Sequence, residues 1–265
     1  MEISIPKEKG QICKYSLDSP QIIAPNGEEL FVYVPQNEEE LKEAWKVLED
    51  YTKRIAPNPE SVYQDLDDIA DVIKWHFGKE LGYIVFTAVD SDKNPKAVAT
   101  TEIASLSDMV GKYPGAKDKG MGFIYQIGHN EEVSFDDEDF SVITQLYGYL
   151  PRLLPEISIY KDNNWLGIVT ESRKEGAELE AILDADFEEL VSKEFYRPPA
   201  VQQEKIKDKE NRTTTDLVLL GLGIPTDSES RLMVAEAYLT HAYRQPLEET
   251  LKLVNNYFAE QAQSK

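Results

Sequence analysis

Three side chains that could transfer protons lie on or just beyond two predicted strands. Tyr125 lies in a strand predicted over residues 121–128 and His129 just beyond it, and Glu171 directly follows a strand predicted over residues 165–170. An imidazole or a carboxylate can accept a proton and a phenol can donate one, so these types suit general acid–base catalysis. A plainer alternative stays open, in which the histidine is structural and the glutamate is a solvated loop residue.

A second feature is an acidic stretch, residues 131–139, with six carboxylates in nine positions, no base and no glycine. Acidic residues are favoured in the first turn of a helix, so N-capping is one interpretation. A Ca²⁺ or other hard-cation site is another, although the stretch lacks the central glycine of an EF-hand loop. Recognition of a basic partner is a third.

Common catalytic and nucleotide-binding motifs do not occur. The sequence has no Gly-x-Ser-x-Gly, Walker, dinucleotide-binding or His-Glu-x-x-His pattern. His76 and His241 have no partners at metal-ligand spacing, so no metal site is predicted and both are interpreted as ordinary residues. Cys13 lacks the motif of a catalytic nucleophile.

The composition excludes several classes of protein. The 265 residues include 28 Lys+Arg and 49 Asp+Glu, which gives a net charge of −21, and 41% are hydrophobic. This is enough apolar material for a packed core, and the negative charge repels nucleic acid and anionic lipid, so neither is expected as a partner. No apolar run approaches the ~20 residues of a membrane span, and no secretory signal is visible. The lone cysteine fits a reducing cytosol. We therefore expect a cytoplasmic protein.

The elements expected to position these groups alternate irregularly between strands and helices. Asn37 with Glu40 predicts one helix start, and Pro151 is expected to kink or shorten a helix running through residues 140–154. The predicted strands cover residues 31–34, 83–89, 97–103, 121–128, 165–170, 187–196 and 214–222. Helices are predicted after residues 37 and 61, through 140–154, over 174–184, and after 226 and 246. This order predicts a mixed α/β sheet with helices on both faces.

Three parts are predicted in the chain: an irregular lead-in (residues 1–28), an α/β body (29–223) and a C-terminal helical hairpin (224–265). The apolar faces of the hairpin could pack on the body or contribute to a homodimer interface.

Local patterns in the body resemble a known family. Residues 82–90, a polar turn and residues 97–99 look like its central hairpin, and residues 186–190, 195–199 and 216–220 look like its final strand pair. With the element order, these patterns resemble the GNAT (general N-acetyltransferase) superfamily over residues 29–223. The resemblance implies a mostly antiparallel sheet in which the adjacent parallel strands 121–128 and 165–170 splay apart.

The resemblance also implies a ligand and a reaction. Acetyl-CoA or another acyl-CoA would lie between the splayed strands, with its pantetheine arm paired to the backbone of Gln126, Ile127 and Gly128. An amine of a small molecule or a protein would attack the thioester from the opposite side. Tyr125, His129 and Glu171 are then the candidate catalytic residues.

Two positions depart from the family pattern. The glycine-rich pyrophosphate loop is matched here by residues 131–139. Each pair of unit charges near 4 Å repels by about 1 kcal/mol even in water, whereas an exposed charge gains only ~0.3–1 kcal/mol at a helix terminus. Coenzyme A is therefore not expected to bind there in the ordinary way. In the family a tyrosine often donates a proton to the departing thiolate. The matching position here is Ile182, and Tyr160 and Tyr196 are candidate substitutes.

The sequence thus favours an acyl-CoA-dependent N-acyltransferase. The alternative is a non-catalytic GNAT-like protein that binds a partner through its acidic surface. A cation-dependent binding module built around residues 131–139 is a third hypothesis.

Overall fold

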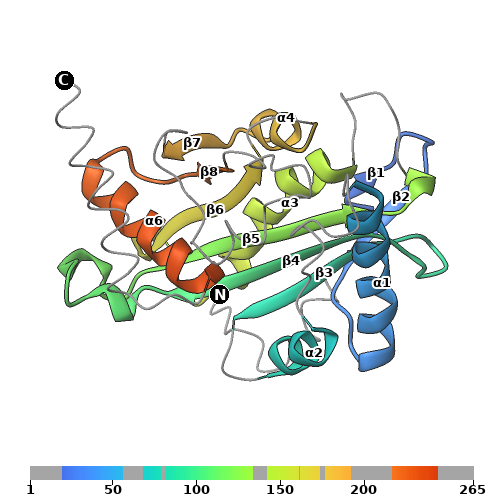
Figure 1. The fold of residues 1–265 in the computed structure, drawn as a ribbon, viewed down its shortest axis with the longest axis horizontal. Helices are drawn as coiled ribbons and strands as arrows, with labels where there is room; N and C mark the ends of the chain where they lie inside the picture. Colours follow the sequence, from blue (N-terminus) through green and yellow to red (C-terminus); the bar gives the residue numbers. More distant parts are fainter. Residues whose placement is uncertain are drawn as a thin grey trace, which may run out of the picture.

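The computed structural model describes residues 20–55, 68–78, 82–133, 142–160, 162–173, 177–191 and 217–243. Within these residues the strands form one eight-stranded sheet with the order β1-β2-β3-β4-β5-β6-β8-β7 (Figure 1). The strands are β1 (Ile22–Ile23), β2 (Glu29–Tyr33), β3 (Tyr83–Val89), β4 (Pro95–Ser105), β5 (Gly120–His129), β6 (Trp165–Arg173), β7 (Glu188–Val191) and β8 (Leu217–Leu222).

Neighbouring strands in this sheet are antiparallel with one exception, the parallel pair β5 and β6. The mixed, mostly antiparallel sheet predicted from the sequence is confirmed. The predicted hairpin is confirmed as well, because β3 pairs with β4 from Tyr83 opposite Glu102 to Val89 opposite Pro95.

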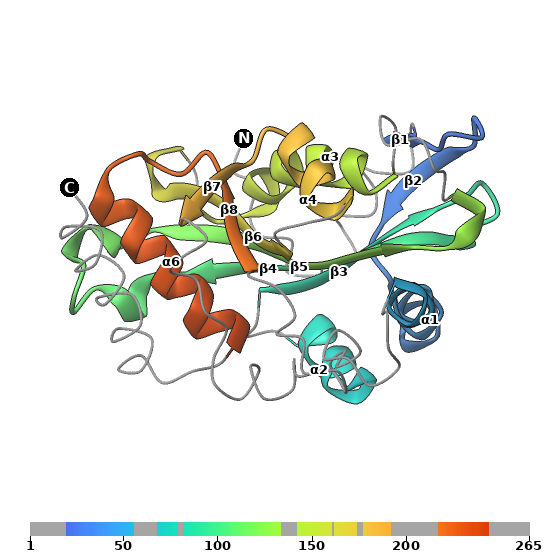
Figure 2. The same cartoon turned by 45° about the horizontal axis from the view of Figure 1, so that its top comes forward.

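Helices cover both faces of the sheet, as predicted (Figure 2). On one face, α3 (Val142–Ile157) and α4 (Ala177–Asp184) share a core cluster with Ile124 and Ile168 of the sheet. On the other face lie α1 (Glu38–Ile55), α2 (Ile69–Phe77) and α6 (Ser228–Tyr243). The two faces of the central strands are therefore buried against different sets of helices.

The start of α1 confirms the predicted helix cap. The Asn37 side chain accepts hydrogen bonds from the backbone N–H groups of Glu39 and Glu40 at 3.1 and 3.0 Å, which satisfies donors that have no partner inside the helix. The Glu40 carboxylate accepts from the Gln36 N–H and from the Tyr33 hydroxyl, both at 2.7 Å. These bonds fix α1 to the end of β2.

α3 continues past Pro151, so the predicted shortening of this helix is wrong. The helix ends at Ile157 and contains both Pro151 and Pro155. A proline inside a helix costs about 3 kcal/mol, whereas a fully buried leucine contributes roughly 1.5–3 kcal/mol. Burial of the predicted face therefore offsets the cost, with Ile143, Tyr147, Leu150 and Leu154 all in the core.

α6 belongs to the core of the described protein. Its N-cap is Asp227, one residue after the predicted Thr226, and the Asp227 side chain accepts from the Ser230 N–H at 2.8 Å. Val234 and Tyr238 pack in one buried cluster with Phe123 and other side chains of the sheet. Packing of this first tail helix on the body is thus confirmed, while the second predicted helix lies outside the described residues and the domain limits stay a prediction.

The outer strand β1 is covered by a side chain of α3. The Gln145 amide accepts from the Ile23 N–H at 2.9 Å and donates to the Ile23 carbonyl at 2.7 Å. Both backbone groups of Ile23 are therefore satisfied without a further strand.

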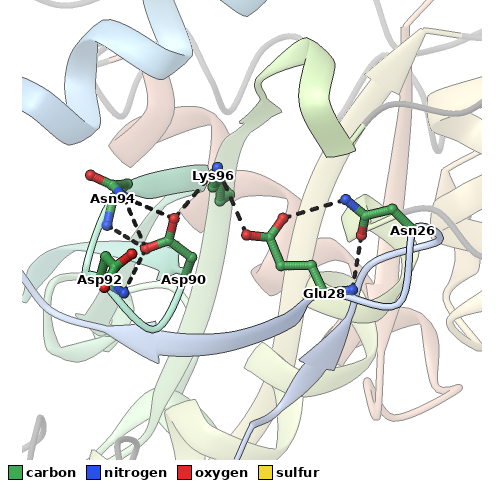
Figure 3. A network of polar contacts seen from close by, with 6 residues as sticks. All are labelled: Asn26, Glu28, Asp90, Asp92, Asn94 and Lys96. Atoms are coloured by element: carbon green, nitrogen blue, oxygen red, sulfur yellow. Dashed lines mark hydrogen bonds and ion pairs between the residues drawn. The ribbon is translucent and has the colours of Figure 1, made fainter.

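A polar network joins two turns at one end of the sheet (Figure 3). Lys96 Nζ lies 3.5 Å from Asp90 and 3.8 Å from Glu28. The Asp90 carboxylate also accepts from the N–H groups of Asp92 and Asn94 at 2.9 and 2.8 Å. Burial acts to raise the pKa of Asp90, but the hydrogen bonds and the Lys96 charge outweigh it and lower the pKa. The network ties the β3–β4 turn to the β1–β2 turn.

None of the helices in the described ranges combines the length and apolar character needed to cross a membrane.

Candidate functional site

The parallel strands β5 and β6 pair over only part of their length. Their last paired residues are Ile124 and Thr170, where the Thr170 hydroxyl donates to the Ile124 carbonyl at 2.9 Å. Beyond this point β5 continues to His129 beside β4, and β6 continues to Arg173 beside β8. The two strands therefore separate in the middle of the sheet, as predicted.

A β-bulge lies at the point of separation. The pairing of β5 with β4 passes from Ile124 directly to Gln126, so Tyr125 is an extra residue in the strand. A bulge bends the strand and redirects side chains. As a result Ile124 and Ile127, three residues apart, both lie in the cluster under α3, while Tyr125 packs on the opposite face.

Tyr125 is hydrogen-bonded to a carboxylate that also contacts α6. Its hydroxyl donates to Glu102 Oε2 at 2.5 Å, and His241 Nδ1 lies 3.2 Å from Glu102 Oε1. An ionised carboxylate only accepts hydrogen bonds, so the His241 Nδ1–H is the donor. The Glu102 side chain is 14% exposed and that of His241 is 28% exposed. Residues from β5, β4 and α6 thus form one connected polar group.

Aromatic rings surround this polar group. The ring of Tyr125 lies 5.9 Å from Phe123, 6.3 Å from Tyr238 and 6.4 Å from Tyr83, between centroids. Burial raises the pKa of Tyr125 well above its ordinary value, and the charge of Glu102 raises it further. The phenol is therefore protonated at neutral pH, and its proton is directed at Glu102.

Glu171 lies across the separation from Tyr125. It is one residue beyond Thr170 and pairs with Leu219 of β8. Because side chains alternate along a strand, Glu171 shares the face of Val169, which packs with α6. Tyr125 and Glu171 are thus the first residues past the separation on their strands, and they lie on the same face.

His129 does not join these two residues. It is four positions beyond Tyr125, or roughly 13 Å along a strand that rises ~3.3 Å per residue. Its ring packs on Tyr51 of α1 with centroids 4.9 Å apart, and its Nδ1 lies 2.9 Å from the Asn130 carbonyl. Burial lowers the pKa of His129, so the ring is neutral at neutral pH. Nδ1 then carries the proton and Nε2 is an acceptor.

We expect His129 to make stability depend on pH. Its pKa is lower in the folded than in the unfolded chain, so the unfolded chain binds more protons as the pH falls below about 6.5, the ordinary value. The free energy of unfolding should therefore fall with pH in this range, by less than about 1.4 kcal/mol for each unit of pKa difference. Urea unfolding at pH 7.5 and 5.5 measures the effect. An equal pH dependence in His129→Asn would contradict it.

The three residues predicted to pair with pantetheine follow the bulge. Among the described residues, no strand pairs with the β6-facing side of Gln126, Ile127 and Gly128. Gly128 also lets α1 approach, because a Cβ there would lie 2.8 Å from atoms of Leu48 and Tyr51. Their role in ligand binding stays a prediction.

The strand order and the separation of β5 from β6 together decide the fold. The chain has a GNAT-like fold. No protein-family model matches the sequence, and no curated protein matches it either.

Several solved structures are similar to this GNAT-like chain. An acetyltransferase of the GNAT family from Listeria monocytogenes aligns over 76% of this chain and 98% of its own, at 12% identity and a TM-score of 0.46. AAC(6')-Ib in complex with ribostamycin and coenzyme A aligns over 60% of this chain and 82% of its own, at 16% identity and a TM-score of 0.39. The C-terminal condensation domain of Ebony in complex with beta-alanyl-dopamine aligns over 74% of this chain and 99% of its own, at 11% identity and a TM-score of 0.46. The assignment of the fold depends on the topology described above.

The GNAT-like fold brings a cation to the acidic stretch that the sequence alone did not reveal. Arg54, near the end of α1, donates to the His129 carbonyl at 2.7 Å and lies 3.8 Å from Glu131. Its guanidinium also lies 5.4 Å from the centroid of the Tyr51 ring. Of the acidic stretch, residues 134–139 lie outside the described residues, so the capping and cation hypotheses for them stay untested. Within the described ranges, no three His, Cys, Asp or Glu side chains are grouped as metal ligands.

Of the other tyrosines considered as acids, Tyr160 is not near the separation. Tyr160 packs against Gly120, where a Cβ would lie 2.1 Å from its ring. Gly120 is at the start of β5, five residues before Tyr125. Tyr196 lies outside the described residues.

Sequence reasoning missed Glu102 and His241. A weak signal existed for Glu102, which is the single charged residue between Ala97 and Ile103 in a predicted strand. None existed for His241, because it lies 139 positions from Glu102 in the chain and only the packing of α6 brings them together. The earlier interpretation of His241 as an ordinary residue is therefore incomplete.

Proposed function

We propose that the chain is an acyl-CoA-dependent N-acyltransferase of the GNAT type, which transfers an acetyl or longer acyl group to an amine of a small molecule or a protein. The observation that carries the proposal is the separation of β5 from β6 with a buried, protonated Tyr125 at its apex.

The reaction needs one proton to leave and one to be supplied. The amine nitrogen attacks the thioester carbon, so a C–N bond forms and the C–S bond breaks. The nitrogen loses one proton and the departing sulfur gains one, which balances the step for a neutral amine. Tyr125 is the proposed donor to sulfur, and its O–H, which points at Glu102 in this structure, would have to turn about the Cζ–O bond toward the sulfur for this step. Glu171, on the same face across the separation, is the proposed acceptor from nitrogen. His129 is too distant from Tyr125 to act on the same atoms directly.

The phosphates of coenzyme A would need a positive charge near the end of β5. Arg54 is placed there, and its contact with the 82%-exposed Glu131 is weak enough to be exchanged for a phosphate. This supports a binding mode that does not depend on a glycine-rich loop.

Calorimetry and amide hydrogen exchange on the full chain test the proposal, with acetyl-CoA and a long-chain acyl-CoA as ligands. We expect heat of binding and slower exchange at Gln126, Ile127 and Gly128, because pantetheine would pair with their backbone. Exchange within β3 should not change. ATP is the matched control, since it carries phosphates but no pantetheine.

Two results would contradict the proposal: no heat with either acyl-CoA, or protection that spares β5. The first would favour the alternative, a GNAT-like protein that binds a partner through its acidic surface.

A further inference from the structure

We propose that α6 is a working part of the site, with His241 as a positioning residue that holds Glu102 in place for Tyr125. This inference rests on the proposed acyl transfer, but one of its tests does not require any activity.

The geometry assigns separate partners to the two oxygens of Glu102. Oε1 faces His241 Nδ1 at 3.2 Å and Oε2 accepts from the Tyr125 hydroxyl at 2.5 Å. With both oxygens bound, the carboxylate plane is held, and so is the position of the phenol oxygen. Loss of the donor on Oε1 would remove one of the bonds that orient the glutamate side chain, and the partner of the Tyr125 hydroxyl would be held less well.

α6 is packed firmly enough on the sheet to hold His241 in place beside Glu102. Residues 233–239 are all buried. Upstream of His241, Glu236 is fully buried and bound to Lys112 Nζ at 2.5 Å, and Arg231 lies 3.9 Å from Glu188. The ring of His241 also packs on Phe123, with centroids 5.4 Å apart. The imidazole is therefore fixed by helix packing on the same strand that carries Tyr125.

The position of His241 gives it a different role from that of Tyr125. Tyr125 would touch the departing sulfur, whereas His241 contacts Glu102 and Phe123 and would touch no reacting atom. A small displacement of a catalytic group can cost a large factor in rate, so the effect of removing His241 should appear in kcat and not in the KM for the acyl-CoA.

Two substitutions of His241 separate positioning from packing. His241→Leu substitutes an apolar side chain of similar size and removes the hydrogen-bond donor. His241→Asn places an amide N–H near the position of Nδ1. We expect the leucine variant to lower kcat by roughly 10- to 100-fold at an unchanged KM for acetyl-CoA. Most of the loss should be recovered in the asparagine variant. Glu229→Gln, an exposed charge change at the start of α6, is the matched control.

The activity-independent test uses the NMR signal of the Tyr125 phenol carbon in protein labelled at tyrosine Cζ. The signal is identified among the 14 tyrosines by its absence in Tyr125→Phe. It should move in His241→Leu, and in His241→Ala if the leucine variant is insoluble, and return in His241→Asn. An unmoved signal overturns the inference whatever the activity, whereas a wild-type protein that binds no acyl-CoA overturns the proposed function and leaves this test decisive.

Discussion

Replacing Tyr125 with phenylalanine should lower kcat for acyl transfer by about 10²- to 10⁴-fold, the usual contribution of a general acid. The substitution removes one oxygen and keeps the ring, which packs among Phe123, Tyr83 and Tyr238. Binding of acetyl-CoA should persist, because the proposed pantetheine contacts are made by the backbone beyond Tyr125. The measurement is release of the coenzyme A thiol from acetyl-CoA with a panel of primary amines.

Tyr160→Phe is the control for this experiment, because Tyr160 packs at the other end of β5 against Gly120. It should retain full activity. If Tyr125→Phe also retained activity within a few-fold, the tyrosine would be a packing residue and its hydrogen bond to Glu102 would be structural.

Replacing Lys112 with methionine should lower the free energy of unfolding by about 3 kcal/mol, at the low end of the range for removing one partner of a buried ion pair. Glu236 is fully buried, and its Oε1 lies 2.5 Å from Lys112 Nζ. Without the lysine, the carboxylate would stay in the core next to Tyr113, whose pKa is raised by burial and by Glu236. Methionine keeps the length of the side chain, so packing changes little. Urea unfolding measures the difference.

Two further variants identify the cause of that loss. Lys112→Met combined with Glu236→Gln removes the unpaired charge and should recover part of the stability. Lys42→Met removes an exposed pair with Glu38, in which both side chains are more than half exposed, and should cost below about 1 kcal/mol. Equal losses in Lys112→Met and Lys42→Met would show that the Glu236 pair contributes no more than a surface contact.

Much of the fold could be predicted because its signals are local. A run of β-branched and aromatic residues located β3 as Tyr83–Val89 at its observed bounds, and the side-chain cap of Asn37 located the start of α1. The effect of Pro151 could not be predicted in the same way, because it depends on how much burial α3 gains from the sheet.

The site was only partly predictable for a related reason. Tyr125 and Glu171 follow from the predicted strands 121–128 and 165–170, but the bulge at Tyr125 is visible only when the register with β4 is known. Glu102, His241 and Arg54 reach their places through packing between distant segments. His76, also interpreted as an ordinary residue, is fully buried and accepts from the Val85 N–H at 3.1 Å.

The side-chain amide of Gln145 on β1 has a consequence for assembly. It occupies the N–H and C=O of Ile23 that would otherwise be offered to a neighbouring molecule. A second copy of the chain therefore cannot extend the sheet at Ile23 without first displacing this glutamine. Any dimer that leaves Gln145 in place would have to join through a surface other than the β1 edge at Ile23, and Gln145→Ala would open a route to association through β1.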